Sequence, residues 1–283
     1  MLKGVGLNRR SEKNSTVLLT LATGAYEELL EYSGPVMKMY AEKWCWDYYP
    51  VIESLDKTRP DAWSKLLAIS ECLSRYETVV YIDSDALILN LDTNILQEIP
   101  NEFEFAWALG EINGIQTPNA GVMVIRRTTN TINLFEMAYG ITHLIYDAWW
   151  DQIALMTALN YVDPRSEIKR KVINIDAEKQ VSVYHLPNKW NVTSQEVGIG
   201  ETNIRHFAGD PFILKKIFMI EYLSRTYKGV ALIDFGFDSS WLKRDYNRIR
   251  KEIFEKLTPK RKKLYFVLQN FFAKLRIRKI KYR

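Results

Sequence analysis

The sequence predicts an α/β fold in which helices cover both faces of a mainly parallel central sheet, followed by a basic helical tail at the C-terminus. β-Branched and aromatic runs alternate with amphipathic stretches of helical spacing through the first 85 residues, a rhythm typical of parallel sheets. Apolar residues make up 47% of the 283 residues, which suits one large domain with a sizeable core. Residues 260–283 are strongly basic, and their apolar positions follow helical spacing.

The first third of the chain contains the clearest elements. In chain order, we expect a buried strand at 16–23, a helix at 35–46, a strand at 49–54, a helix beginning at Pro60 and a strand at 78–82. The helix at 35–46 is expected to begin at Pro35, because proline is tolerated in the first turn of a helix. The run TVVYI at 78–82 is β-branched and aromatic, as buried strands are.

The later part of the chain is less regular. Its expected strands are 104–109, 121–126, 181–185 and 203–207, and its expected helices are 129–141, 148–159, 212–227 and a basic stretch from Trp241 onward. In a mainly parallel sheet, ligands bind beyond the carboxyl ends of the strands. Polar residues that follow these strands are therefore the first candidates for a functional site.

Charge divides the chain unevenly. The net charge is +5, but residues 260–283 hold ten Lys or Arg and no acid, so the rest carries −5 (5 − 10). We expect one domain over 1–257 and a basic amphipathic helical tail over 258–283. The acidic body argues against a nucleic-acid partner. The apolar face and basic ends of the tail are typical of a helix on an anionic membrane surface, although a helix packed on the domain fits the same pattern.

We expect neither a signal peptide nor a membrane-spanning helix. The first residues have no apolar core of signal-peptide length, and no apolar run reaches the length of a membrane-spanning helix. Cys45 and Cys72 imply neither a disulfide framework nor a zinc cluster, and we expect both to be buried free thiols. We expect a cytoplasmic protein, with peripheral contact to the cytoplasmic membrane face as an option through its tail.

An acidic pair follows the best-defined strand. Asp83 and Asp85 come directly after 78–82, and carboxylates at i and i+2 point the same way when the chain is extended. At a strand end they can converge on one hard cation, since Mg²⁺ and Mn²⁺ prefer oxygen ligands. A solvated turn with two acids has the same spacing. The apolar run 86–89 directly afterwards makes a plain surface turn less fitting.

The segment AWSKLLAISECLSRYETVVYIDSDALILN (62–90) resembles the donor site of retaining glycosyltransferases with the GT-A fold. It is most like the galactosyl- and xylosyltransferases of glycosyltransferase family 34, and it is also similar to the glycogenin-like family 8. Three further pieces occur in the order that this resemblance expects: PNAGV at 118–122, Asp151-Gln152 at the start of a helix, and HFAGD at 206–210.

The resemblance implies a metal-dependent nucleotide-sugar site. Asp83, Asp85 and His206 would hold Mn²⁺ or Mg²⁺, and the imidazole favours Mn²⁺. A histidine paired with a backbone carbonyl is the structural alternative for His206. Asp151 and Gln152 would form the catalytic pair, with Asp151 on sugar hydroxyls and Gln152 stabilising an oxocarbenium-like state. An acid at a helix N-terminus and an exposed glutamine are the alternative there.

The resemblance also implies a set of donor-binding residues: Leu21, Ala22, Thr23, Lys65, Asp83, Ser84, Asn119, Ala120, Gly121 and Gly209. Lys65 would contact the donor phosphate or nucleotide, unless it is an ordinary exposed lysine of an amphipathic helix. Asn119 would bind sugar hydroxyls, unless it is a turn residue before a strand. Trp190 and Asn191 could line the acceptor site, although buried packing fits them as well.

The predicted function is transfer of a hexose or pentose from a nucleoside diphosphate sugar, a UDP-sugar by resemblance, to a glycan or glycolipid acceptor with retention. Two other classes share some of these features. A non-catalytic glycan- or membrane-binding module would keep the fold with a degenerate site. A phosphatase would also place Asp-x-Asp after a strand, but it normally does so near the start of its domain. The donor sugar and the acceptor do not follow from the sequence.

Overall fold

In this computed structural model, the described residues are 14–112, 114–165, 181–193, 201–227, 244–245, 247–249 and 251. The chain divides into two compact units, 1–210 and 211–283. The first contains the central sheet and every candidate site residue. In the second, the main described element is helix α5 (Phe212–Thr226). The expected boundary at 257/258 and the basic tail lie outside the described residues, so both stay predictions.

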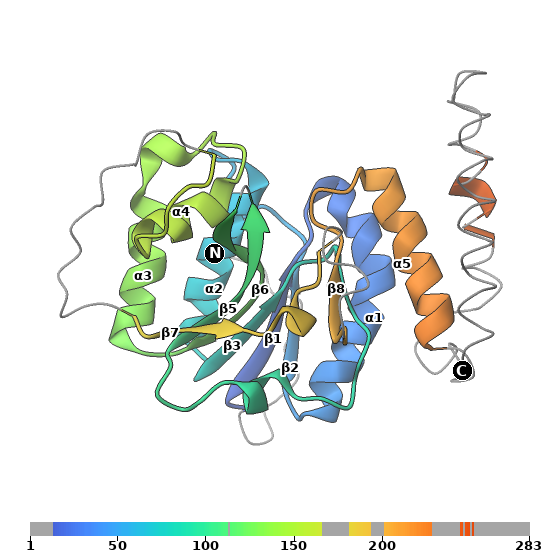
Figure 1. The fold of residues 1–283 in the computed structure, drawn as a ribbon, viewed down its shortest axis with the longest axis horizontal. Helices are drawn as coiled ribbons and strands as arrows, with labels where there is room; N and C mark the ends of the chain where they lie inside the picture. The colour runs from blue at the N-terminus through green and yellow to red at the C-terminus, as the bar shows by residue number, and fades with distance from the viewer. Residues whose placement is uncertain are drawn as a thin grey trace. The chain divides into compact units, whose positions relative to one another are not determined.

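The first unit is built on a sheet of six strands in the order β2-β1-β3-β6-β5-β7 (Figure 1). Its strands are β1 (Thr16–Leu21), β2 (Asp47–Val51), β3 (Thr78–Ile82), β5 (Phe105–Ile112), β6 (Ile115–Arg126) and β7 (Val183–Leu186). The pairs β1–β2, β1–β3 and β5–β7 are parallel, whereas β6 runs antiparallel to both of its neighbours. The expected mainly parallel sheet is confirmed, with β6 as its reversed strand.

Helices cover both faces of this sheet. Helix α1 (Glu27–Lys43) lies on one face, and α2 (Ser64–Leu73), α3 (Thr129–Gly140) and α4 (Trp150–Ala158) lie on the other (Figure 1). Because side chains alternate along a strand, Val17 and Leu19 of β1 enter the core beneath α2 while Leu18 faces the other layer. The inner strands β1 and β3 therefore read as nearly continuous apolar runs, as expected of strands buried on both faces.

A second, two-stranded sheet pairs β4 (Ala86–Ile88) with β8 (Ile204–His206). Its antiparallel register places Ala86 opposite His206. The remaining described elements are short 3₁₀ helices at Gly24–Tyr26, Asp61–Trp63, Ile95–Glu98, Thr142–Leu144 and Asn188–Trp190. The small sheet matters for function because it joins segments that are far apart in the sequence.

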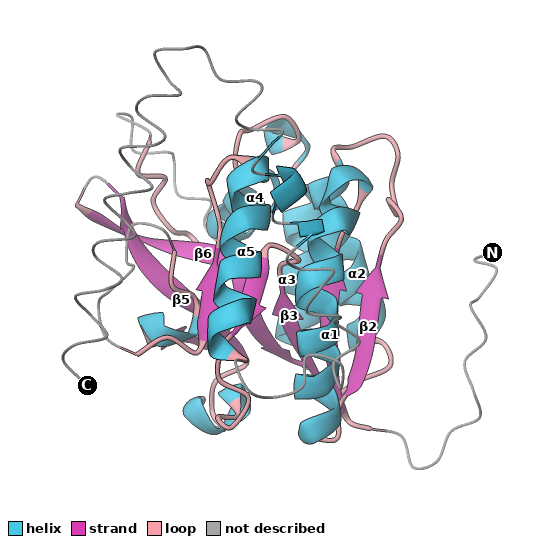
Figure 2. Cartoon of the chain, turned by 90° about the vertical axis from the view of Figure 1, so that its right-hand side faces the viewer, coloured by secondary structure: helices cyan, strands magenta, loops and turns pink. Residues whose placement is uncertain are grey.

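Strands β5 and β6 form a long hairpin (Figure 2). Both extend beyond the strands expected from the sequence, since Ile112 pairs with Ile115 across a two-residue loop. The Asn-Gly sequence of that loop is a strong hairpin signal, and Gly114 has the positive φ that it serves (76°). A register shift between Trp107 and Ala108 leaves 120–122 of β6 opposite no β5 partner.

Helix α1 corrects the expectation that Pro35 begins a helix. The helix starts at Glu27, and Pro35 lies inside it. Proline inside a helix costs about 3 kcal/mol. Here an unbroken apolar stripe crosses the proline, and its burial outweighs that cost: Leu29, Tyr32, Ser33, Val36, Met37, Tyr40 and Ala41 are all buried at helical spacing.

Other expectations need smaller corrections. The second strand begins at Asp47 rather than residue 49, and the chain after Pro60 forms a 3₁₀ turn before α2 begins at Ser64. Cys72 is buried as expected, but Cys45 is exposed at the turn after α1. Among the described residues, each helix falls short of the length and apolar character required to cross a bilayer.

Candidate active site

The candidate site lies where three segments meet. Asp83 follows β3 at its carboxyl end, and Asp85 lies immediately before β4. His206 ends β8, which pairs with β4, so the small sheet brings the imidazole to the two acids. The backbone strengthens this junction, because Asp83 N–H donates to Gly121 O (2.8 Å) and Phe207 N–H donates to Asp85 O (3.0 Å).

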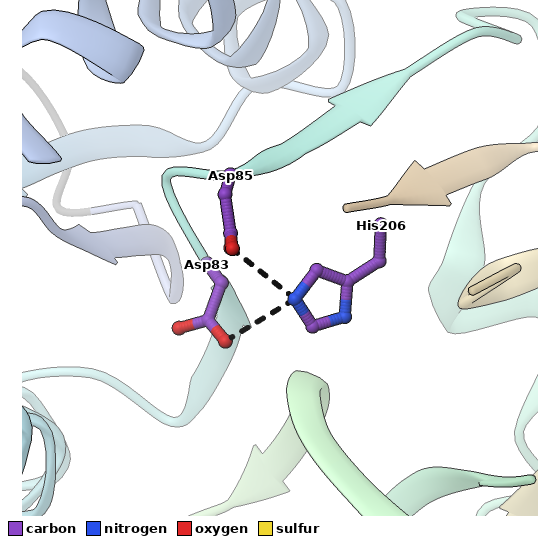
Figure 3. Close-up of side chains that lie close together, drawn as sticks. All are labelled: Asp83, Asp85 and His206. Atoms are coloured by element: carbon purple, nitrogen blue, oxygen red, sulfur yellow. Dashed lines mark ion pairs between the residues drawn. The ribbon is translucent and has the colours of Figure 1, made fainter. Parts of the chain in front are cut away.

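The three expected metal ligands converge (Figure 3). His206 Nε2 lies 3.2 Å from Asp85 Oδ1 and 3.7 Å from Asp83 Oδ2. One ligand atom from each residue lies within 4.8 Å of the others. Asp85 is 5% exposed and His206 is 3% exposed. Asp83 is half-buried and faces the same imidazole, so the acidic pair is not a solvated turn.

Lys65 of α2 is a buried lysine that faces two carboxylates. It is 6% exposed, and its Nζ lies 2.8 Å from Asp151 Oδ2 and 3.1 Å from Asp83 Oδ1. The Nζ also donates to Ala120 O at 3.4 Å. Lys65 therefore joins Asp83, an expected metal ligand, to Asp151 of the expected catalytic pair. The exposed-lysine alternative is wrong.

The cluster gathers three carboxyl groups around one lysine and one imidazole. Burial lowers the pKa of Lys65, but the carboxylates of Asp151 and Asp83 outweigh burial and raise it above the usual lysine value, so the lysine stays charged. Burial raises the pKa of Asp151, which Lys65 opposes. Lys65 therefore balances charge on Asp83 and Asp151, whereas Asp85 faces the imidazole of His206.

The chemistry of this donor set tests whether a metal fits. Two carboxylates and one imidazole suit Mn²⁺, and a divalent cation between Asp83 and Asp85 would offset the repulsion of two neighbouring carboxylates. Tyr81 strengthens the arrangement by donating its hydroxyl to Asp83 Oδ1 (2.7 Å). Burial, followed by the charge of Asp83, raises the pKa of Tyr81 well above its usual value, so it remains a donor. The residues therefore fit a divalent ion.

The unpaired bulge of β6 supplies backbone groups to the site. Ala120 N–H donates to Gln152 Oε1 (3.2 Å), and Ala120 O accepts from Lys65. Gly121 N–H donates to Asn119 Oδ1 (2.9 Å), and its carbonyl accepts from Asp83. β-Bulges are frequent next to active sites because they redirect backbone groups out of the strand ladder.

One asparagine bonds the imidazole of His206, and a second asparagine bonds the first. Its Nδ1 lies 2.9 Å from Asn191 Oδ1, and Asn191 Nδ2 donates to Asn119 Oδ1 (2.9 Å). The backbone-carbonyl alternative for His206 is therefore wrong. A Cβ at Gly121 would lie 2.1 Å from His206 Cε1, so the imidazole occupies the space that this glycine leaves open.

The remaining expected residues lie around this cluster. Leu21 ends β1 in the core, Ala22 N–H donates to Val51 O, and Thr23 is half-buried before the turn at Gly24. Ser84 is buried, and its carbonyl accepts from Ser33 Oγ (2.8 Å). Gly209 is exposed with φ 74° in the loop after β8. Their roles in donor binding stay predictions.

Sequence reasoning missed two features. Tyr81 reads as an ordinary strand aromatic, although its place two residues before Asp83 puts both side chains on one face of the chain. Asn191 carries no local signal for contact with His206. Trp190 beside it is fully buried and donates to Glu98, so packing is the correct interpretation of that indole.

No model of a protein family and no curated protein matches the chain. Solved structures do match. A glycosyltransferase involved in glycosylation of the major capsid of PBCV-1 is 14% identical, with a TM-score of 0.54 over 72% of this chain and 98% of that one. The glycosyltransferase GlyE of Streptococcus pneumoniae TIGR4 is 13% identical, with a TM-score of 0.50 over 84% and 64% of the two chains. The chain thus has the GT-A fold of these glycosyltransferases, and the fold class expected from the sequence is confirmed.

Proposed function

We propose that this chain is a metal-dependent glycosyltransferase that moves a hexose or pentose from a UDP-sugar to a glycan or lipid-linked acceptor with retention. The observation that carries the proposal is the buried cluster of Asp83, Asp85 and His206 beyond the carboxyl end of β3. In a GT-A fold this edge of the sheet is where a ligand is expected.

The cluster accounts for donor binding. Asp83, Asp85 and His206 would hold the cation, with Mn²⁺ favoured by the imidazole. When bound, such a cation stabilises the negative charge that develops on a departing diphosphate. The carboxylates of Asp83 and Asp85 would repel a bare diphosphate, so we expect donor binding to depend on the metal.

Asp151 and Gln152 form the part of the proposed site that would bind the sugar of the donor. Asp151 is placed by Lys65, and Gln152 is fixed by Ala120 N–H, so both side chains are positioned before any ligand arrives. In the proposed reaction, Asp151 binds sugar hydroxyls and the Gln152 carboxamide faces the anomeric carbon. A carboxamide is a poor nucleophile, so its contribution is to stabilise positive charge on the sugar.

Retention follows if the acceptor attacks from the side of the leaving group. The acceptor oxygen forms a bond to the anomeric carbon as the bond from that carbon to the diphosphate breaks. The acceptor proton passes to an oxygen of the departing phosphate, which leaves as nucleoside diphosphate. This route needs no side chain as general base.

A screen of nucleotide-sugars for hydrolysis with Mn²⁺ tests the proposal. One donor should release nucleoside diphosphate, whereas release of inorganic phosphate would indicate the phosphatase alternative. Asp83→Ala and Asp85→Ala should each lower turnover by about 100-fold or more, and Asp92→Ala, at an exposed surface ion pair, should not. Metal-dependent nucleotide binding without turnover of any donor would favour the non-catalytic module.

A variant of Gln152 distinguishes an effect on donor binding from an effect on the chemical step. Gln152→Ala should lower kcat more than it weakens donor binding, because its proposed interaction strengthens as charge develops on the sugar. The measurement is kcat from single-turnover hydrolysis beside donor Kd from calorimetry. An unchanged kcat with weakened donor binding would make Gln152 a binding residue.

A further inference from the structure

His206 has two ring nitrogens, and the metal site needs one particular nitrogen to offer a lone pair. In Figure 3, Nε2 points toward Asp83 and Asp85 while Nδ1 points away from them. A neutral imidazole carries its hydrogen on either nitrogen, and coordinates do not show which. The hydrogen-bond partners behind the ring determine the answer.

The chain of partners begins at a group whose polarity is certain. Gly121 N–H is a backbone donor, and it lies 2.9 Å from the Asn119 side chain. The atom of Asn119 that faces it must therefore be the carbonyl oxygen, since the amide nitrogen would set donor against donor. Gly121 lies in the bulge of β6, where it is opposite no β5 residue.

The orientation of the Asn119 carboxamide fixes the orientation of Asn191, which in turn fixes the hydrogen of His206. Asn119 Oδ1 also faces the Asn191 side chain at 2.9 Å, so the Asn191 atom nearest to it must be the NH₂ group. The other end of that carboxamide is then an oxygen, and it lies 2.9 Å from His206 Nδ1. An oxygen can only accept, so His206 Nδ1 must donate.

We propose that Gly121 N–H, acting through Asn119 and Asn191, fixes the hydrogen of His206 on Nδ1 and leaves Nε2 as the nitrogen available to a metal. Asn191 is thus a positioning residue for the metal ligand. Its burial supports this role, since Asn191 and His206 are both 3% exposed and water competes poorly for their hydrogen bonds. The inference assigns Asn191 a role different from acceptor binding.

The chain's composition makes the proposal directly measurable. The protein has three histidines, so a ¹⁵N-histidine sample gives few imidazole signals, and His206→Ala assigns one of them. Long-range ¹H–¹⁵N correlation distinguishes a nitrogen that carries hydrogen from one that does not. We expect His206 Nδ1 to carry hydrogen with and without Zn²⁺, used as a diamagnetic probe, and we expect Zn²⁺ to shift the Nε2 signal.

Two variants test the role of Asn191. Asn191→Leu removes the acceptor, so the Nδ1 assignment should be lost and Mn²⁺ affinity should fall about 10- to 100-fold. Asn191→Asp keeps an acceptor for Nδ1 but no longer donates to Asn119 Oδ1, so it should keep the Nδ1 hydrogen and bind Mn²⁺ more tightly than Asn191→Leu, at a cost in stability. Asn203→Leu is the matched control, because Asn203 is equally buried next to β8 but bonds Asn90 rather than His206.

The outcomes are decisive in either direction. A wild-type spectrum with hydrogen on Nε2 and none on Nδ1 would overturn the proposal, as would wild-type Mn²⁺ affinity in folded Asn191→Leu. Should that variant fail to fold, the wild-type spectrum and Asn191→Asp still decide the question. The inference uses the metal site of the proposed function, but its spectrum is read without any sugar transfer, so failure of the transferase assay leaves this result standing.

Discussion

Alanine at Gly121 should disable the metal site through one added methyl group. That Cβ would lie 2.1 Å from His206 Cε1 and 2.4 Å from His206 Nδ1, where ordinary contact begins at 3.4 Å. The imidazole would have to retreat by about 1.3 Å to relieve the first contact. Gly121 is not among the glycines with positive φ, so alanine brings the clash without backbone strain.

The size of this displacement sets the expected loss. Metal–ligand distances tolerate a change of about 0.2 Å, so a ring moved by more than an ångström no longer binds the ion. We expect Mn²⁺ affinity to fall by about 100-fold or more, and metal-dependent donor hydrolysis to fall by a similar factor. The assay is Mn²⁺ binding followed by electron paramagnetic resonance, beside thermal unfolding of the metal-free protein.

Two further proteins make the result interpretable. Gly140→Ala is the control, because no atom lies within 4 Å of its added Cβ, and alanine at this helical position should stabilise the fold by up to about 1 kcal/mol. In a His206→Ala background both contacts with the imidazole are absent and the 2.9 Å contact with Asn119 Oδ1 remains, so Gly121→Ala should cost less stability there than in the wild-type background. Wild-type Mn²⁺ affinity in Gly121→Ala, or equal destabilisation with and without His206, would refute the reasoning.

Three other perturbations have expected outcomes. Lys65→Met leaves buried carboxylates unpaired, so it should lower stability by about 3–5 kcal/mol in thermal unfolding, with partial rescue by Asp151→Asn. Hydrogen bonds from Thr58 and Tyr139 lower the pKa of Asp56 to about 2. Asp56→Asn should therefore lower the free energy of unfolding by its full amount above pH 4, and this loss should vanish as the pH falls through 2. A pH-independent difference between the two proteins would contradict this. Trp150 is 45% exposed beside Asp151 with φ 41°, so Trp150→Gly should keep the melting temperature but raise the KM for a glycan acceptor, leaving donor hydrolysis unchanged.

Strands and motifs with local signals could be predicted from the sequence. The β-branched run 78–82 forms β3 at the expected residues, and the alternation of elements gives the sheet its mainly parallel character. The full length of the β5–β6 hairpin was also within reach, because Asn-Gly at 113–114 is a local signal. Pro35 shows the opposite case, in which a local rule fails against an apolar stripe that buries a whole helix face.

Partners that depend on three-dimensional packing could not be predicted. Lys65 sits on an amphipathic helix where its spacing suits an exposed lysine as well as a buried one. The burial of Lys65 depends on the reversed strand β6, which brings Ala120 O to the lysine Nζ at the start of α2. Helix α4 brings Asp151 to the same point. Asn191 is a similar case, because its contact with His206 arises from the loop before β8.

The bulge of β6 explains why the two halves of the site are positioned together. In a regular strand, the backbone groups of Ala120 would be committed to the ladder with β5. Released from it, Ala120 binds Gln152 and Lys65, and the neighbouring Gly121 N–H orients His206 through Asn119 and Asn191. The Gly121 carbonyl also accepts from Asp83 N–H. Any change that restores a regular β5–β6 register should therefore disturb metal binding and sugar positioning at once, whereas a change at Asn191 should leave the contacts of Ala120 with Gln152 and Lys65 in place and act on His206.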